Sequence, residues 1–265
     1  IGKTTALQRQ MIGGTSNSIG MAIAPLVISY LIFHGTPLHD IVTKQFIIPL
    51  IILILIMLII TILVGKTQMP SIDNVRQVPG EKFDKSVWSF RNLKLGVWGI
   101  FFYVGIEVAV GANVNMYASE LGGSFASNAT HMAALYWGLL LLGRFLGSFI
   151  KQVPSEKQLV IASIGAIVLL VLAMLTANPW ILTLIGFFHS IMWPAIFTLA
   201  TDQLGKYTTK ASGVLTMGVI GGGIIPLLQG IFADVMGGNW LWTWLLVIAG
   251  EAYILYYGLN GYKQH

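Results

Sequence analysis

The stretch QLVIASIGAIVLLVLAMLTANPWILTLIGFFHSIMWPAIFTLAT, residues 158–201, contains no Asp, Glu, Lys or Arg. A helix crosses the ~30 Å hydrocarbon core of a bilayer with about 20 apolar residues, so this stretch is too long for one span and long enough for two. The dipeptide Asn178-Pro179 near its middle is a turn signal. We therefore predict two membrane-spanning helices here, over about 158–177 and 180–201.

The composition of the whole chain has the same character. Of its 265 residues, 55% are hydrophobic and 9% are charged, and the mean hydropathy is +0.78. An ordinary soluble domain carries about 25% charged residues, so a soluble globular protein, a disordered chain and a nucleic-acid-binding protein are excluded. The chain has no cysteine, which excludes a disulfide scaffold, a thiolate metal site and a catalytic cysteine. The composition therefore predicts an all-α polytopic membrane protein.

Further charge-poor stretches predict the other spans. Their approximate ranges are 10–33, 46–65, 96–118, 130–150, 211–233 and 240–259, which makes eight transmembrane helices in all. If the first helix starts in the cytoplasm, every Lys and Arg except Lys44 lies on the cytoplasmic side. This asymmetry follows the positive-inside rule. We therefore expect both termini and the polar segment 66–94 to lie in the cytoplasm.

The segment 66–95 divides the chain. Two predicted helices precede this cytoplasmic linker, within residues 1–65, and six follow it, within residues 96–265. The first and seventh predicted helices align at an offset of 201 residues, through the pairs Arg9 and Lys210, Thr15 and Thr216, Gly20 and Gly221, and Pro25 and Pro226. This repeat makes the first helix the fifth of a preceding six-helix half. In that register four more helices precede the chain, and its start at Ile1 rather than Met is consistent with a longer protein.

Several motifs carry a family resemblance. They are NSIG (17–20) followed by Ala24-Pro25, FFYVGIE (101–107), LYWG (135–138) with GRFLG (143–147), HSIMWPAIF (189–197), LGKYT (204–208) and GGGIIPLLQG (221–230). Together, over about residues 9–234, they resemble the sugar–proton symporters of the major facilitator superfamily, in the branch that contains L-fucose permease and the bacterial glucose/galactose transporters.

The resemblance implies a fold and a function. The fold is two six-helix bundles around a central site, of which this chain would supply helices 5 to 12 of twelve. The function is secondary active import of a small sugar, of the fucose, glucose or galactose type, by proton symport and alternating access. The resemblance implies a monomer in the bacterial cytoplasmic (inner) membrane, surrounded by lipids, with no cofactor, metal or nucleic acid. One departure concerns residues 11–14 (MIGG), where the family often has Asn and Gln, so the identity of the sugar stays open.

Glu107 is the first candidate site residue. It lies near the middle of its predicted helix, where a carboxylate costs about 2.5–3.5 kcal/mol and needs a partner or a wet cavity. It is therefore an acceptor for sugar hydroxyls, a proton-linked group, or a structural carboxyl bonded to a neighbouring helix. Tyr103 shares its helix face at i−4.

Three amide side chains are further binding candidates, because an amide both donates and accepts hydrogen bonds, as a sugar hydroxyl does. They are Asn17 in the first predicted helix, Asn113 near the outer end of the third, and Gln229 in the glycine-rich seventh. For each of them, solvation or an interhelical hydrogen bond is the alternative interpretation.

Two further candidates lie one turn apart on the sixth predicted helix. Trp193 offers a ring on which the apolar face of a sugar can pack, and His189 either contacts the substrate or satisfies a neighbouring backbone group. Pro194 removes a backbone hydrogen bond and predicts a kink, which suits a gate and also plain packing.

Charged residues near helix ends are candidates for gating. Arg144 and Asp202 both fall near cytoplasmic ends, where they form a gate pair or, in the case of Arg144, extend toward lipid headgroups. Glu251 lies on the last predicted helix, and we expect it to be structural or to face lipid headgroups.

Other functions are less consistent with the sequence. No phosphate loop, His-Glu-x-x-His or G-x-S-x-G motif is present, and the five histidines are scattered, which argues against a membrane-embedded enzyme. A channel would need a repeated filter or a charged ring. Two alternatives stay open, a major facilitator transporter of a non-sugar solute and a chain that is inactive by itself. The second follows because the family carries its principal coupling carboxylates on the first four helices.

Overall fold

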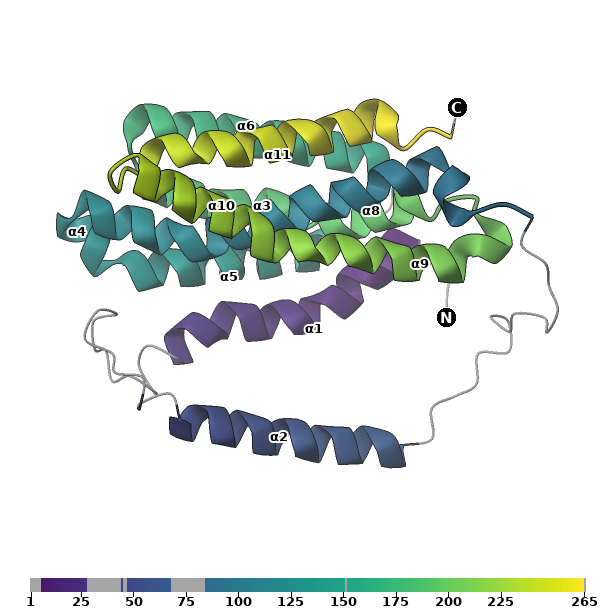
Figure 1. The fold of residues 1–265 in the computed structure, drawn as a ribbon, viewed down its shortest axis with the longest axis horizontal. Coiled ribbons are helices and arrows are strands. Elements are labelled where there is room, and N and C mark those ends of the chain that lie inside the picture. Colours follow the sequence, from purple (N-terminus) through teal and green to yellow (C-terminus); the bar gives the residue numbers. More distant parts are fainter. Residues whose placement is uncertain (1–5, 28–43, 45–46, 68–83, 151, 265) are drawn as a thin grey trace. The chain divides into compact units, whose positions relative to one another are not determined.

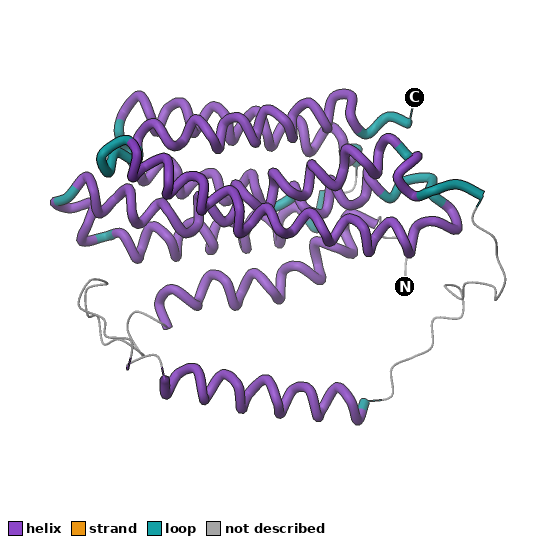
Figure 2. Tube along the Cα trace, viewed as in Figure 1, coloured by secondary structure: helices purple, strands orange, loops and turns teal. Residues whose placement is uncertain are grey.

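The computed structural model describes residues 6–27, 44, 47–67, 84–150 and 152–264. Within these ranges every regular element is helical, as Figure 2 shows, which confirms the predicted all-α class there. The chain forms two compact units, one of residues 24–82 and one of residues 1–23 together with 83–265.

The unit of residues 24–82 contains α2 (Ile47–Lys66), which has no charged residue before its last position. Ile and Leu side chains occupy all of its faces, as expected of a helix surrounded by lipid. Its Thr61 hydroxyl donates to the backbone oxygen of Met57 at 2.7 Å, so this polar group is satisfied within the helix. Residues 28–33 of the first predicted helix and 68–83 of the predicted linker lie outside the described residues.

The larger unit holds the other helices, connected by short 3-10 turns and closed by a π-helical turn at Tyr257–Gly261. The segment α3 begins at Arg91, before the predicted position 96, so the end of the predicted linker is helical. The elements are α1 (Ala6–Leu26), which starts in this unit, α3 (Arg91–Leu121), α4 (Gly123–Ser127), α5 (Ala129–Gly147), α6 (Ser155–Thr176), α7 (Pro179–His189), α8 (Met192–Ala200), α9 (Thr208–Thr216), α10 (Gly221–Val235) and α11 (Trp244–Tyr256).

Five stretches among the described residues are long and apolar enough to cross a membrane: Ile47–Lys66, Arg91–Leu121, Ser155–Thr176, Pro179–Ala200 and Gly205–Val235. The three other predicted spans coincide with α1, α5 and α11. The first two carry polar and charged side chains, and α11 has only 13 residues between its flanking turns. The arrangement of eight transmembrane helices, two before the linker and six after it, therefore stays a prediction.

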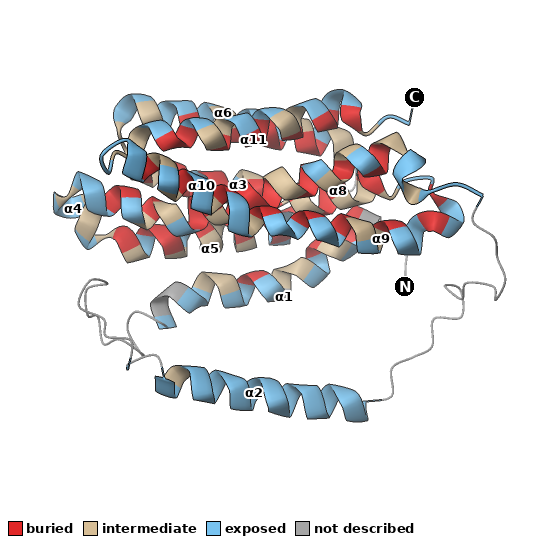
Figure 3. Cartoon of the chain, viewed as in Figure 1, coloured by how far each residue is buried: buried red, intermediate tan, exposed pale blue. Residues whose placement is uncertain are grey.

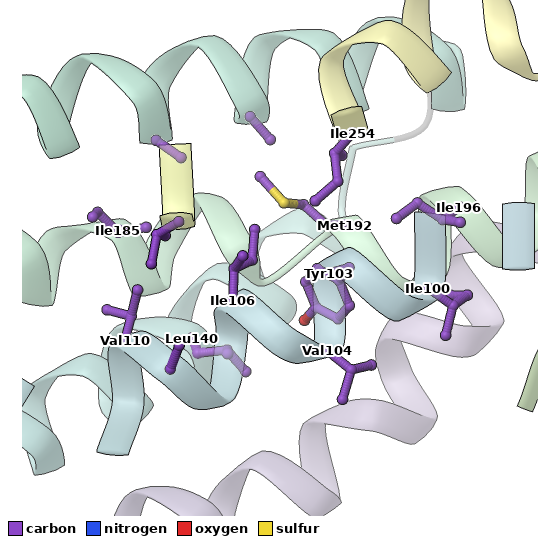
Figure 4. Packing of buried hydrophobic residues seen from close by; sticks show 14 of the residues in the cluster. Ile100, Tyr103, Val104, Ile106, Val110, Leu140, Ile185, Met192, Ile196 and Ile254 are labelled. Carbon is purple, nitrogen blue, oxygen red and sulfur yellow. The ribbon is translucent and has the colours of Figure 1, made fainter. Parts of the chain in front are cut away.

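Helix α3 lies at the centre of the larger unit, where it packs against α5, α7, α8, α10 and α11 (Figure 1). Buried residues gather along it and along the sides of its neighbours (Figure 3). Figure 4 shows Tyr103 and Ile106 of α3 beside Met192 of α8 and Ile254 of α11, all within one apolar cluster. This packing fixes the position of the next α3 residue, Glu107.

Two glycines bring α5 and α7 into backbone contact. A Cβ atom on Gly186 would overlap the carbonyl oxygen of Tyr136, and one on Gly143 would lie 2.7 Å from the carbonyl oxygen of Phe187. Close approach of this kind between membrane helices requires small residues. The two helices therefore pack with almost no side-chain layer between them at these points.

The helix predicted over 180–201 is interrupted between α7 and α8. The interruption covers Ser190 and Ile191, and Pro194 lies in the first turn of α8, so the predicted kink falls before the proline rather than at it. Proline has no N–H to donate to the carbonyl four residues earlier, and its ring displaces that carbonyl. Regular helix resumes with the bond from Ala195 N to Ile191 O, at 3.0 Å.

Candidate functional site

A cavity of about 410 Å³ lies in the larger unit, among α1, α3, α5 and α8. Cavities of this size hold small organic ligands. Five of the predicted site residues line it, and they come from segments that are distant in the sequence. The lining residues are Gln10, Gly14, Asn17, Met21, Val104, Glu107, Arg144, Trp193, Pro194 and Val219.

Glu107 and Arg144 form a buried ion pair in the wall of this cavity. The Arg144 Nη2 atom lies 3.4 Å from Glu107 Oε1, and both side chains are less than one-tenth exposed. A carboxylate at this depth needs a partner, and the guanidinium supplies one. Glu107 therefore has both a partner on a neighbouring helix and a place in the cavity wall, which the sequence offered as alternatives.

The Arg144 guanidinium is also held by three other acceptors. Nη1 donates to Ser18 Oγ at 2.8 Å and to the carbonyl of Gly14 at 3.4 Å, and Nε donates to the carbonyl of Ser190 at 3.3 Å. The Ser190 carbonyl is available because Pro194, four residues later, has no N–H. One side chain of α5 therefore contacts α1, α3 and the break between α7 and α8.

These contacts correct two expectations for Arg144. It does not extend toward lipid headgroups, because its side chain turns into the bundle toward Glu107 and Ser18. The gate pair with Asp202 is not formed among the described residues. The backbone oxygen of Asp202 instead accepts hydrogen bonds from Asn92 Nδ2 at 3.3 Å and Gln264 Nε2 at 3.0 Å, which ties down the end of α8.

Tyr103 and Trp193 form the aromatic part of the site. Trp193 lines the cavity, and its ring centroid lies 6.4 Å from that of Tyr103, which is fully buried behind the wall. The Tyr103 hydroxyl is within electrostatic reach of Glu107 and Arg144, but it meets hydrogen-bond geometry with no described residue. The site thus has an aromatic surface beside its ion pair.

Amides of α1 complete the polar lining. Asn17 is exposed, and its Nδ2 contacts only Met21 Sδ, at 3.6 Å, among the hydrogen bonds of the described residues. About two turns earlier, the buried Gln10 Oε1 has no hydrogen-bond partner in the described part of the chain. Gln10 thus adds an amide to the cavity beside residues 11–14, and a Cβ atom on Gly14 would lie 3.5 Å from Arg144 Cδ.

His189 lies outside the cavity lining, in a second polar cluster. Its Nδ1 is 2.6 Å from Tyr136 Oη and its Nε2 is 2.6 Å from Glu251 Oε1, and the three side chains are completely buried. Glu251 therefore does not face lipid headgroups, since it is directed into the bundle toward α7. The Tyr136 hydroxyl also lies 3.1 Å from the backbone oxygen of Glu107, to which it can donate.

The amides of Asn113 and Gln229 bind each other rather than the cavity. Asn113 Nδ2 donates to Gln229 Oε1 at 2.9 Å, and Gln229 Nε2 donates to Thr243 Oγ1 at 3.0 Å. These bonds connect α3, α10 and the turn before α11. In this structure they match the interhelical alternative, and neither amide is among the cavity residues.

The sequence analysis did not identify Ser18 as a partner of Arg144, Gln10 as a cavity residue or Glu251 as a partner of His189. Ser18 lies inside the NSIG motif, one turn after Gly14, so its face was readable from the sequence. The cost of a mid-membrane carboxylate, applied to Glu107, applies equally to Glu251 and predicts a buried partner. The identity of that partner is set by the fold alone.

The arrangement offers donors, acceptors and an aromatic face to one small ligand. Arg144 donates, Glu107 accepts, the amides of Asn17 and Gln10 do both, and Trp193 presents a ring. Among the described residues, no group of three or more His, Asp or Glu side chains could hold a metal ion.

Comparison with known proteins matches this chain to one large family. Residues 9–226 match the family model described as Major Facilitator Superfamily. A glucose/galactose transporter of Brucella abortus (biovar 1, strain 9-941) is 33% identical over 268 residues, covering 98% of this chain and 65% of the Brucella protein. The L-fucose-proton symporter of Escherichia coli K12 is 28% identical over 199 residues, covering 71% of this chain and 45% of the symporter.

The fold agrees with a solved transporter structure. The crystal structure of FucP, a major facilitator transporter in the outward conformation, superimposes with a TM-score of 0.71 at 23% identity, covering 96% of this chain and 68% of that one. The chain thus spans about two-thirds of the length of these full-length proteins. Fold, helices and relatives are those of membrane transporters, and the chain belongs to the Major Facilitator Superfamily.

Proposed function

We propose that the full-length protein imports a small sugar, of the fucose, glucose or galactose type, across the bacterial cytoplasmic membrane by proton symport and alternating access. The observation that carries the proposal is the cavity, where the ion pair of Glu107 and Arg144 lies beside the ring of Trp193. The names of the similar proteins from Brucella abortus and Escherichia coli support the class of substrate and, for the second, the coupling ion.

The cavity is complementary to a sugar in its chemistry. A sugar hydroxyl both donates and accepts, so it can accept from Arg144 and donate to Glu107 at the same time. The pair is separated by 3.4 Å, at the long end of a hydrogen bond, so a hydroxyl can replace this contact at modest cost. The apolar face of the sugar ring packs on Trp193, and Asn17 and Gln10 bind the remaining hydroxyls.

The proton is carried at the Glu107 carboxyl. When Glu107 is protonated, it no longer provides the negative charge that holds Arg144, and the guanidinium relies on Ser18, Gly14 and Ser190. Protonation of Glu107 therefore weakens the interactions that hold the Arg144 side chain in position. Because Arg144 contacts both the cavity and α1, sugar binding and proton binding act on the same side chain.

The remaining features of the proposal follow from the sequence. The chain supplies helices 5 to 12 of two six-helix bundles, with both termini and the linker 66–95 in the cytoplasm, as the distribution of Lys and Arg predicts. The protein works as a monomer surrounded by lipid. Relative motion of the bundles exposes the cavity to each side in turn.

The test is uptake of labelled fucose, glucose and galactose by cells that express the full-length protein and lack their own hexose importers. We expect one sugar to accumulate, and a protonophore to abolish its accumulation. Glu107→Gln should lower accumulation at least tenfold. Glu120→Gln is the matched control and should leave uptake unchanged. This exposed carboxylate of α3 lies outside the cavity and accepts a hydrogen bond from the Trp240 N–H at 2.9 Å.

Three outcomes would contradict parts of the proposal. No uptake of any hexose by protein that reaches the membrane would reject the sugar and favour a non-sugar solute. Sugar accumulation that is unchanged by the protonophore would reject proton symport. Wild-type accumulation by Glu107→Gln would reject a role for Glu107 in proton coupling.

A further inference from the structure

A second set of titratable groups lies behind the cavity wall and takes no part in the proposed sugar site. Tyr136 of α5, His189 at the end of α7 and Glu251 of α11 form a chain with two contacts of 2.6 Å each. All three side chains are 0% exposed. The Tyr136 hydroxyl lies 3.1 Å from the backbone oxygen of Glu107, so the chain connects α11 to the helix that carries the cavity carboxylate.

The number of protons in this chain decides the direction of its hydrogen bonds. In the protonated form, Glu251 and His189 share one acid proton between Oε1 and Nε2, and Nδ1 carries the second imidazole proton. The Nδ1–H group then donates to Tyr136 Oη. The Tyr136 hydroxyl is left free to donate to the carbonyl of Glu107, so every donor in the chain is used.

Loss of one proton reverses part of this order. The proton passes to water and leaves one negative charge on the Glu251 carboxylate, which accepts from Nε2–H. Nδ1 is then a bare acceptor, and the Tyr136 hydroxyl must donate to it. The carbonyl of Glu107 thereby loses the Tyr136 donor. This single proton thus determines whether the Tyr136 hydroxyl donates to His189 of α7 or to the Glu107 carbonyl of α3.

Burial favours the electrically neutral, protonated form of the hydrogen-bonded cluster of Tyr136, His189 and Glu251. A net charge in a completely buried cluster is costly, and Glu251 Oε2 has no hydrogen-bond partner among the described residues. The groups that face the cluster are Tyr103 and Glu107 from α3 and Arg144 from α5, with opposite charges on the last two. The proton therefore leaves when rearrangement of the helices admits water.

We propose that Tyr136, His189 and Glu251 form a proton-binding site distinct from Glu107, which takes up and releases one proton in each transport cycle. Its occupancy acts on the cavity through the hydrogen bond of Tyr136 to the Glu107 carbonyl, and on the break between α7 and α8 through His189. This inference rests on the proposed proton-coupled transport of a sugar.

The test compares two activities of the full-length protein in proteoliposomes. Sugar counterflow needs binding and alternating access, whereas accumulation driven by a proton gradient also needs proton release. Glu251→Gln keeps the size and hydrogen-bonding capacity of the side chain and removes its ionisation. We expect counterflow within threefold of wild type and accumulation lowered at least tenfold.

Thr243→Val is the matched control. It breaks a different buried polar cluster, in which Thr243 binds Gln229 and no ionisable group takes part. A purely structural loss lowers both activities together, so this variant should leave the ratio of accumulation to counterflow unchanged. Wild-type accumulation by Glu251→Gln would overturn the inference, while failure of the wild type to accumulate any sugar would overturn the proposed function instead.

A second measurement decides the matter if Glu251→Gln lowers both activities or fails to fold. Nitrogen-15 NMR of His189, in protein whose other histidines are replaced by glutamine, reports which ring nitrogen carries hydrogen. We expect Nδ1 to carry hydrogen in the protonated form of the cluster and to lose it when the cluster is deprotonated at higher pH. One unchanging tautomer under all these conditions would overturn the inference.

Discussion

The Arg144 side chain binds the backbone carbonyl of Ser190, four residues before Pro194. The Arg144 Nε atom donates to this carbonyl at 3.3 Å. The carbonyl is free to accept because residue 194 is a proline, which has no backbone N–H to compete with Arg144. The break between α7 and α8 therefore contributes an acceptor to the cavity as well as a change of helix direction.

Replacing Pro194 by Ala should weaken sugar binding. The new N–H competes with Arg144 for the Ser190 carbonyl, and a hydrogen bond of a charged group contributes about 1.5–3 kcal/mol. Since competition removes only part of it, we expect roughly a tenfold loss of affinity in calorimetry of the purified full-length protein. Pro226→Ala, which changes the proline inside α10, is the control and should bind as wild type. Equal affinities of the two variants would contradict the role given to Pro194.

Removing the charge of Arg144 alone should destabilise the protein more than removing both charges. Arg144→Met leaves Glu107 buried without its partner, which costs about 3–5 kcal/mol, whereas the double variant with Glu107→Gln replaces the pair by neutral groups. We expect the double variant to recover at least about 1 kcal/mol of unfolding free energy. Unfolding in mixed micelles measures this coupling, and strictly additive effects would show that the pair is not coupled.

Gly186→Ala should destabilise the packing of α5 on α7. The added methyl group meets the backbone oxygen of Tyr136, which cannot turn away as a side chain could, and overpacking of this kind costs about 1–3 kcal/mol. Thermal unfolding in detergent should therefore occur at a lower temperature. Gly138→Ala, on α5 where a Cβ meets nothing within 4 Å, should leave the midpoint unchanged or raise it. A neutral Gly186→Ala would contradict the contact.

Trp193→Ala should reduce sugar affinity about tenfold by removing the ring against which the sugar packs, while Trp193→Phe keeps part of this surface and most of the affinity. Trp98→Ala controls for the loss of an indole, because Trp98 is 51% exposed and lies outside the cavity. Affinity should be measured with the sugar that accumulates in the uptake assay. If Trp98→Ala weakens binding as much as Trp193→Ala, the ring contact is refuted.

The apolar spans were the most predictable part of the fold. The predicted helices 46–65 and 158–177 agree with α2 and α6 to within a few residues, because a continuous apolar run determines both the helix and its environment. The interruption at Ser190 and Ile191 was not placed correctly. Pro194 indicates that the helix is disturbed, but the turn that opens depends on which neighbouring group donates a hydrogen bond to the freed carbonyl.

The site was predictable in its residue types and less so in its pairings. A lone buried carboxylate predicts a partner, as it did for Glu107, but the distance along the chain does not identify that partner. Glu251 and His189 are 62 residues apart, and only the packing of α11 against α3 and α6 brings them together. For the same reason the sequence leaves Gln229 open between substrate binding and an interhelical hydrogen bond, and the structure pairs it with Asn113.

The backbone contact between Gly186 and Tyr136 also limits how this protein can vary. Elsewhere in the bundle, one large side chain can shrink while its neighbour grows, so sequences can drift through small compensated steps. At this contact no side chain is available to shrink, and every substitution of Gly186 meets the main chain itself. We expect tolerated changes in α5 and α7 to collect on their exposed faces, such as Leu135, Leu142 and Leu184, while the contact itself passes unchanged through deep mutational selection.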